Sequence, residues 1–303
     1  MNVDGIRRIR KSAGLFTGLV AIVGVLSSAV LPSKPARADE PGVVAKSAGD
    51  SLRGKEAGEI RDDNGLKMKI VWCPPGFVRM GDIDEVPVNA FVTRGYWIGK
   101  FEVTQAEWKR VMKSEPWNGK QFMKVADDIP VTWVSWDDSL AFCHKLTEQE
   151  RQGGRLPAGW EYTLPTEAQW ERACRARTET VFSFGDDAAK LGDHAWFRAN
   201  AIDAGEQYAH PVGQKKPNPW GLYDMHGNVF EWCRDVYVQK LPGGRDPEST
   251  GEGSLRMFRG GSWCVDGSYC RSANRKWTPP QREYVALGVG FRVALCPVTP
   301  AAR

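Results

Sequence analysis

The amino-acid sequence predicts a loop-rich α+β domain with little regular secondary structure. Short strand patterns and three capped helix patterns lie before residue 178, and regular periodicity fades after Arg177. The 13 tryptophans and 32 glycines are scattered among these short segments. We therefore expect large aromatic side chains, rather than long helices or strands, to hold the core together.

Residues 1–38 are expected to be a signal peptide. A basic start from Arg7 to Lys11 precedes an apolar run over residues 13–31, and the small-x-small triplet at 36–38 has the pattern of a cleavage site. The run is long enough to span a bilayer, so an uncleaved membrane anchor is the alternative. Cleavage predicts a periplasmic or secreted protein with no stable membrane span.

Charge and cysteine content set further limits on function. The chain carries 41 basic and 37 acidic residues, and its excess of basic residues lies in the leader. The mature chain is therefore close to neutral, which argues against nucleic acid as a partner. An odd number of cysteines leaves at least one thiol outside any intrachain disulfide. The seven are Cys73, Cys143, Cys174, Cys233, Cys264, Cys270 and Cys296.

The domain is predicted to follow a polar linker over residues 39–66. It is expected to cover residues 67–297, with a short tail over 298–303. It opens with a strand, a Pro-Pro turn and a second strand over residues 68–80, and residues 96–103 show a further strand pattern.

Three helices are predicted from their N-terminal signals. Thr104 begins the first helix, with a glutamate three positions later at capping-box spacing. Ser135 begins the second, which runs to about Gln152 before a Gly-Gly pair. Thr166 begins the third. Residues 178–260 show only short strands and turns, so disulfides, metal ions or side-chain networks are expected to organise them.

Six local signatures follow one another in a characteristic order. They are FEVTQAEW at 101–108, PVTWVSW at 130–136, LPTEAQWE at 164–171, GLYDMHGNVFEW at 221–232, RGGSW at 259–263 and GFRV at 290–293. Together they closely resemble the formylglycine-generating-enzyme (sulfatase-modifying-factor) family over nearly the whole mature chain. The resemblance implies a fold related to C-type lectin domains. It also implies an oxygen-dependent, copper-using oxidation of a substrate cysteine to formylglycine.

A calcium site is predicted at the fourth signature. Asp224 and Glu231 are hard oxygen donors, and Gly227 and Val229 can offer backbone carbonyls from a tight turn. In the family that the chain resembles, the matching positions hold a structural Ca²⁺. The alternative is a turn held by Asx hydrogen bonds without an ion. His226 is expected to be a surface or loop residue, because no second histidine stands at ligand spacing.

The predicted catalytic site is the pair Cys264 and Cys270, with Ser262 and Tyr269 beside it. Two thiolates suit Cu(I), because soft sulfur favours a soft metal ion. The family pattern Gly-Gly-Ser-x-x-Cys-x-x-x-x-Cys places Cys270 in register. Val265 stands at the first copper cysteine of that pattern, and Cys264 lies one residue early.

The sequence leaves other cysteine arrangements open. Cys264 and Cys270 could form a plain disulfide, or Cys270 could pair with Cys233. Phe230 stands where the active family usually has tryptophan, so an indole N–H donor is absent. Cys143 and Cys174 match two cysteines that form disulfides in the family. The positions of their partners hold Val293 and Arg275 here, and Cys296 could substitute for one partner.

Three functions fit these observations. The first is a copper- and O₂-dependent oxidase that matures a protein or peptide cysteine. The second is an enzyme with a small-molecule substrate, similar to the periplasmic relatives that mature a siderophore chromophore. The third is a non-catalytic, lectin-like binding or scaffold domain. The fold supports each of these uses, so the site has to decide between them.

Overall fold

The computed structural model describes residues 52–81, 86–251, 253–281 and 288–298. All of them belong to one unit, Lys46–Arg303. The predicted signal peptide lies outside the described residues. Within the described part of the chain, no helix is both long enough and apolar enough to cross a membrane.

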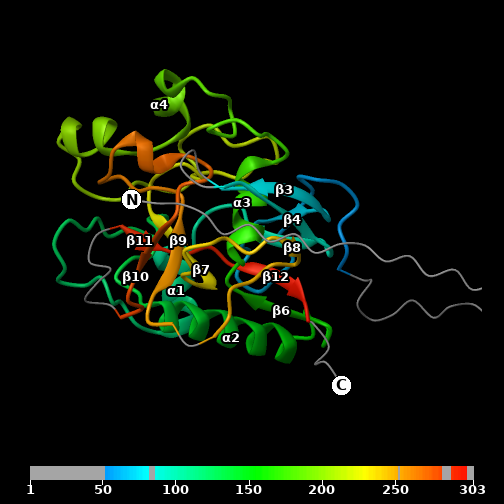
Figure 1. The fold of residues 1–303 in the computed structure, drawn as a ribbon. Helices are drawn as coiled ribbons and strands as arrows, with labels where there is room; N and C mark the ends of the chain where they lie inside the picture. The colour runs from blue at the N-terminus through cyan, green and yellow to red at the C-terminus, as the bar shows by residue number, and fades with distance from the viewer. Residues whose placement is uncertain (1–51, 82–85, 252, 282–287, 299–303) are drawn as a thin grey trace, which may run out of the picture. The chain divides into compact units, whose positions relative to one another are not determined.

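The largest sheet has five strands in the order β1-β2-β5-β12-β6, and every neighbouring pair is antiparallel. Figure 1 shows two of these strands, β12 and β6, side by side. The strands are β1 Ile60–Arg61, β2 Ile70–Cys73, β5 Tyr96–Gly99, β12 Ala294–Pro297 and β6 Trp160–Thr163. Every residue of β2 and β5 is buried, in agreement with their unbroken apolar sequences. The last strand of the chain lies between β5 and β6, so the C-terminal segment completes the sheet.

Two smaller sheets accompany it. The order β3-β4-β8 joins β3 Gly76–Met80, β4 Val88–Val92 and β8 Gly244–Arg245. The order β10-β9-β7-β11 joins β10 Lys276–Thr278, β9 Arg256–Arg259, β7 Phe230–Val236 and β11 Val289–Gly290. The predicted Pro-Pro turn separates β2 from β3, but the two strands enter different sheets. The predicted strand over 96–103 ends at Gly99, where the guanidinium of Arg292 donates a hydrogen bond to the carbonyl.

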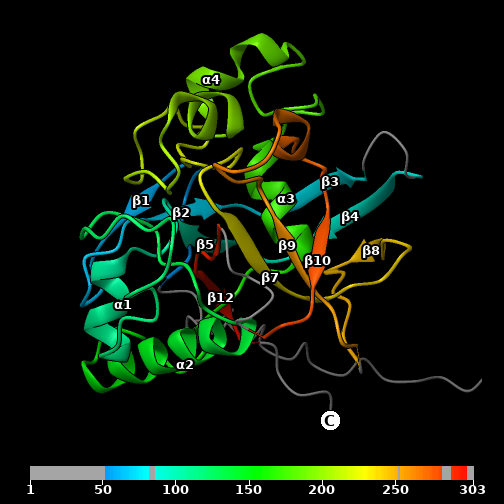
Figure 2. The same ribbon diagram turned by 90° about the vertical axis from the view of Figure 1, so that its left-hand side faces the viewer.

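All three predicted helices are confirmed, and each begins with a capping box. They are α1 Gln105–Met112, α2 Trp136–Gln152 and α3 Glu167–Arg175, capped by Thr104, Ser135 and Thr166. Helix α2 packs against α1 and β6, whereas α3 contacts β3, β7 and β9. Figure 2 shows α3 beside the strands of both smaller sheets, which it therefore connects.

The core is rich in aromatic side chains, as the composition predicts. Trp108 stacks on Phe142 with ring centroids 5.7 Å apart, and Phe291 meets both rings edge-on. These three residues come from α1, α2 and the segment before β12. Burial of such large rings joins elements that are too short to be stable alone.

Residues 52–66, which the sequence assigns to a linker, pack against the domain. The indole N–H of Trp97 donates to the Leu52 carbonyl at 2.7 Å, and the backbone N–H of Gly65 donates to Glu150 at 2.9 Å. Strand β1 pairs with β2 in the same stretch. Polar composition does not reveal this docking, because it depends on backbone groups and on partners far along the chain.

The region between α3 and β7 contains short helical turns and one isolated β-bridge, between Phe182 and Gly185, among its described residues. The expected lack of long elements is confirmed, whereas the short strands expected there do not form in this described part of the chain before β7. The helical turns are η2 Ala188–Lys190, α4 Leu191–His194, η3 Arg198–Asn200 and η4 Ile202–Ala204. A further 3₁₀ turn, η5 Gly267–Cys270, ends at the predicted catalytic cysteine.

Candidate functional site

A tight glycine turn positions the predicted catalytic segment. Gly261 has φ +81°, and a Cβ atom there would lie 2.6 Å from the sulfur of Cys270. Only glycine permits this backbone conformation together with so close an approach. The turn delivers Ser262 to a fully buried position and lets the 3₁₀ turn that ends at Cys270 fold back against it.

Ser262 contacts both predicted copper ligands. Its hydroxyl oxygen lies 3.5 Å from the sulfur of Cys264. Its backbone hydrogen-bonds to Cys270. Cys270 is buried and Cys264 is half-buried. Burial raises the pKa of the Cys270 thiol to about 12, and the Ser262 backbone opposes that shift. The structure thus brings both predicted cysteines into contact with one serine.

No disulfide joins any of the seven cysteines, all of which lie in the described residues. The two disulfides that the sequence leaves open, Cys264–Cys270 and Cys233–Cys270, are therefore not formed in this structure. Cys296 also lacks the suggested disulfide and lies 3.6 Å from the side-chain nitrogen of Gln169.

Aromatic side chains flank the cysteine segment. Tyr269 is half-buried, and the ammonium group of Lys276 lies 4.4 Å from the centre of its ring. Trp263 is buried. Phe230 packs edge-on against Phe258 with centroids 4.9 Å apart. The position that carries tryptophan in the active family is thus filled by an apolar contact without an N–H donor.

His226 corrects the sequence analysis, which expects a surface or loop histidine. The residue does lie in a loop, but only 2% of it is exposed. Its Nε2 accepts a hydrogen bond from the backbone N–H of Ser183, so its Nδ1 carries the proton and donates to the Cys270 carbonyl at 2.8 Å. Burial lowers the pKa of His226 to about 4. A neutral histidine therefore holds the turn that ends at Cys270.

The predicted calcium turn is tightly packed. A Cβ atom at Gly227 would lie 2.3 Å from the Trp196 carbonyl oxygen, so glycine is required there. Val229 is fully buried. Asp224 has φ +59°, and its Oδ2 accepts from the backbone N–H of Gly213 at 2.7 Å. The sequence thus predicts a turn here correctly. The structure adds the groups that the turn contacts, which are the carbonyl of Trp196 and the backbone N–H of Gly213.

Glu231 is paired with a guanidinium. Both of its carboxylate oxygens accept hydrogen bonds from Arg292 at 2.6 Å, and Oε2 also accepts from the indole of Trp170 at 2.7 Å. All three side chains are fully buried. This fork-to-fork pair neutralises the charge of Glu231 and ties β7 to the segment before β12.

Glu102 is a carboxylate that the sequence analysis does not identify. It is fully buried, and its Oε1 accepts from the side-chain amide of Asn228 at 3.2 Å. Among the described residues, no other group donates to its Oε2 or to the Oδ1 of Asp224, and the side chains of Glu102 and Asp224 lie within hydrogen-bonding distance of each other. Burial raises the pKa of both groups, and the charge of Asp224 adds to the shift at Glu102. The sole sequence signal for Glu102 is its place in the first signature.

Two buried carboxylates that lie side by side, each with an oxygen that no other described residue satisfies, fit a hard cation such as Ca²⁺. Among the described residues, no three His, Cys, Asp or Glu side chains form a metal-binding group. A cation beside Asp224 and Glu102 would therefore also need backbone carbonyls, as the sequence predicts for Gly227 and Val229.

The six signatures lie within a stretch of the chain that matches a known protein family. The family described as "Sulfatase-modifying factor enzyme 1-like domain" matches residues 57–296. The chain belongs to this family. The match begins upstream of the predicted domain boundary, in the stretch that packs against β2.

Two curated relatives are about 30% identical to the chain over the aligned residues. The formylglycine-generating enzyme of Streptomyces coelicolor is 31% identical over 214 residues, which are 66% of this chain and 60% of that enzyme. The chaperone protein LppX of Paenibacillus barcinonensis is 28% identical over 206 residues, 55% of this chain and 69% of LppX. The chain thus spans somewhat over half of the Streptomyces enzyme.

A solved structure of the same fold is PvdO from Pseudomonas aeruginosa. It superposes with a TM-score of 0.67 at 25% identity and covers 80% of this chain and 99% of PvdO. This likeness agrees with the predicted α+β, loop-rich fold of the family.

Proposed function

We propose that this member of the sulfatase-modifying-factor family oxidises a cysteine of a protein or peptide substrate to formylglycine. The observation that carries the proposal is the placement of two cysteines, Cys264 and Cys270, against the single residue Ser262. The likeness to formylglycine-generating enzymes supports it. The leader pattern at residues 1–38 supports activity in the periplasm or outside the cell.

The donor set of the site suits Cu(I). Cys264 and Cys270 offer two soft sulfur ligands, and Cys264 is the more exposed of the two. When bound, the ion would supply a binding point for the substrate thiolate and a means of activating O₂. The residues of the chain then have defined tasks: the Ser262 backbone orients the Cys270 sulfur, and His226 holds the carbonyl of the same residue.

The overall reaction balances with an external thiol reductant. The substrate carbon loses its sulfur as hydrogen sulfide and gains an aldehyde oxygen from O₂. The second oxygen atom leaves as water. The electrons that O₂ requires come in equal parts from the substrate carbon and from a pair of external thiols, which leaves as a disulfide.

A structural Ca²⁺ is the second element of the proposal. Asp224 and Glu102 would supply side-chain oxygens, Gly227 and Val229 would supply carbonyls, and Glu231 would shape the turn or join the ligands. The ion would relieve the repulsion between two buried carboxylates and fix the loop before β7. This role concerns stability and not the oxidation itself.

The oxidase function predicts aldehyde formation in a reporter peptide. The purified protein is incubated with Cu(I), O₂, a thiol reductant and a Cys-x-Pro-x-Arg peptide, and the product is followed by mass spectrometry. We expect the mass loss that accompanies replacement of the thiol by an aldehyde. The variants Cys264→Ser and Cys270→Ser should lose this activity at least a hundredfold, because the metal loses a ligand in each.

The matched control is Cys296→Ser, which removes a thiol of the five-stranded sheet and should leave the rate within about twofold of the wild type. Unchanged peptide mass, or equal activity of wild type and Cys270→Ser, would contradict the oxidase. In that case the chromophore-maturing alternative, an enzyme with a small-molecule substrate, would be the next assignment to test.

A further inference from the structure

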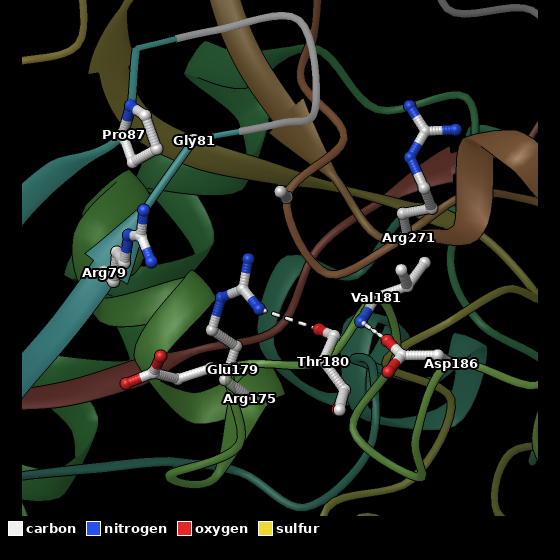
Figure 3. Close-up of a pocket in the computed structure, with 10 residues that line it drawn as sticks. Arg79, Gly81, Pro87, Arg175, Glu179, Thr180, Val181, Asp186 and Arg271 are labelled. Atoms are coloured by element: carbon white, nitrogen blue, oxygen red, sulfur yellow. Dashed lines mark hydrogen bonds between the residues drawn. The ribbon is translucent and has the colours of Figure 1, made fainter.

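A group of arginines lines two adjoining cavities at the end of helix α3. One cavity, of about 250 Å³, is bordered by Arg79, Arg172, Arg175 and Arg177, with Asn89 and the carboxylate of Glu179 on its wall. The second, of about 210 Å³, shares Arg79, Arg175 and Glu179. In Figure 3, which shows the second cavity, Arg175 lies between Arg79 and Arg271. We name the first cavity the arginine pocket.

The sequence at the end of α3 explains this concentration of charge. Arg172 and Arg175 lie three residues apart, so they project from neighbouring positions on one helix face. Ala176 and Arg177 then adopt positive φ values of 48° and 78°, which end the helix and turn the chain. Arg79 enters from strand β3, which contacts α3. Two separate elements thus direct guanidinium groups into one space.

Arg172 is a buried cation whose hydrogen-bond partners, within the described part of the chain, are backbone carbonyls. Its guanidinium donates to the carbonyls of Pro74, Pro75 and Phe77, and Trp220 lies 5.3 Å from it. Only 3% of the residue is exposed. Carbonyl dipoles fix the position of this group but carry no compensating net charge. The pocket wall therefore includes a rigid positive charge held by the fold.

Arg175 is compensated only in part. Its Nε donates to Glu171 at 2.8 Å and its Nη1 donates to the Thr180 carbonyl at 2.9 Å. The other oxygen of Glu171 is bonded by the guanidinium of Arg259, so one carboxylate is shared between two cations. Figure 3 shows the remaining terminal nitrogen of Arg175 directed away from Thr180, into the second cavity, between Arg79 and Arg271.

We propose that the arginine pocket binds an oxyanion group, a phosphate or sulfate ester. A tetrahedral oxyanion presents acceptors in several directions. Arg79 from β3 and Arg177 from the turn after α3 line the pocket as exposed guanidinium donors, and the buried Arg172 and Arg175 of α3 add positive charge to its wall. Four guanidinium groups face a single lining carboxylate, Glu179. The volume is several times the ~30 Å³ that one water molecule occupies in the liquid, so the pocket has room for the organic part of an ester.

The test compares anions at matched ionic strength. Isothermal titration with inorganic phosphate, sulfate and chloride is combined with thermal unfolding in each salt. We expect phosphate and sulfate to bind and to raise the unfolding midpoint relative to chloride. Phosphoserine and serine O-sulfate then distinguish the two ester sources, and the tighter of the two identifies the ligand class.

Two exposed pocket residues serve as variants. Arg79→Gln and Arg177→Gln should each weaken oxyanion binding at least tenfold, because each removes one fork of donors without disturbing a buried contact. Arg245→Gln is the matched control: it is an equally exposed arginine of the same small sheet that does not line the pocket. It should leave binding unchanged. Equal losses in all three variants, or no difference between phosphate and chloride, would overturn the proposal.

Discussion

Single buried ionic residues connect elements that the sequence places far apart. Arg259 is fully buried and donates to Glu167 on one side and to Glu171 on the other. It thereby ties β9 to α3, while Arg292 ties β7 to the segment before β12 through Glu231. A buried pair contributes little relative to an apolar substitute, but removal of one partner leaves a buried charge without compensation.

The substitution Arg259→Met is therefore expected to lower the free energy of unfolding by about 3–5 kcal/mol, because Glu171 and Glu167 lose a buried partner. Urea denaturation measures this change. The control Arg198→Met breaks an exposed ion pair with Asp266, whose side chains are 45% and 69% exposed, and should cost under about 1 kcal/mol. Similar losses in both variants would show that burial does not set the strength of these pairs.

Asp235 gives the fold a pH dependence. It is buried and accepts from the backbone N–H groups of Glu167 and Ser249. Burial, followed by the charge of Glu167, raises its pKa to about 7. In the unfolded chain it titrates near pH 4. Between these values the folded protein binds the extra proton, so this residue makes the free energy of unfolding fall as pH rises from about 4 to 7.

The variant Asp235→Asn should lack this contribution. Asparagine is the poorer acceptor, so the variant is expected to have the lower free energy of unfolding at pH 4. As the pH rises to 7.5, the wild type loses a few kcal/mol that the variant keeps, and the difference between the two proteins shifts in favour of the variant by that amount. Denaturant titrations at several pH values measure the difference. If the difference in the free energy of unfolding between the two proteins stays constant across that pH range, Asp235 keeps its ordinary pKa in the folded protein.

At the scale of elements, the N-terminal caps determine where the three helices begin. Thr166 accepts from the backbone N–H of Gln169, and the Gln169 side chain accepts from the backbone N–H of Thr166 in return. The cap starts α3 at the point where Glu167 and Glu171 meet the arginines of the core. Capping of α3 is therefore coupled to the ion network, which local sequence alone does not show.

Thr166→Ala is expected to cost about 1 kcal/mol, because one N-terminal N–H of α3 loses its acceptor. Thr166→Ser keeps the hydroxyl and should cost only a few tenths of that amount. Thermal unfolding of both variants checks the prediction. If the serine variant is as unstable as the alanine variant, packing of the threonine methyl group, and not the cap, accounts for the loss.

At the scale of the whole molecule, three small sheets are held together by α3, by aromatic residues and by long-range ion pairs. The segment between α3 and β7 has little regular structure, so its stability depends on contacts such as those of Asp224 and Glu102. A cation at that turn would stabilise the entire unit, since the turn leads directly into β7.

Addition of Ca²⁺ to protein treated with a chelator is expected to raise the unfolding midpoint by several degrees, and Mg²⁺ should have a smaller effect because it demands stricter geometry. Asp224→Asn and Glu102→Gln should each reduce the calcium-dependent shift. The exposed Asp187→Asn should retain it. A midpoint that does not respond to Ca²⁺ in the wild type would remove the metal from the proposal.

The sequence by itself determined the helices with their caps, the Pro-Pro and glycine turns, the family, and the segment that carries Cys264 and Cys270. Each of these depends on residues that are close in the chain. Tertiary structure alone decided that Glu102 joins Asp224, that Glu231 pairs with Arg292, that His226 is buried, and that Arg79 meets the arginines of α3. Such contacts join positions far apart in sequence, where burial and charge compensation, rather than local propensity, select the partner.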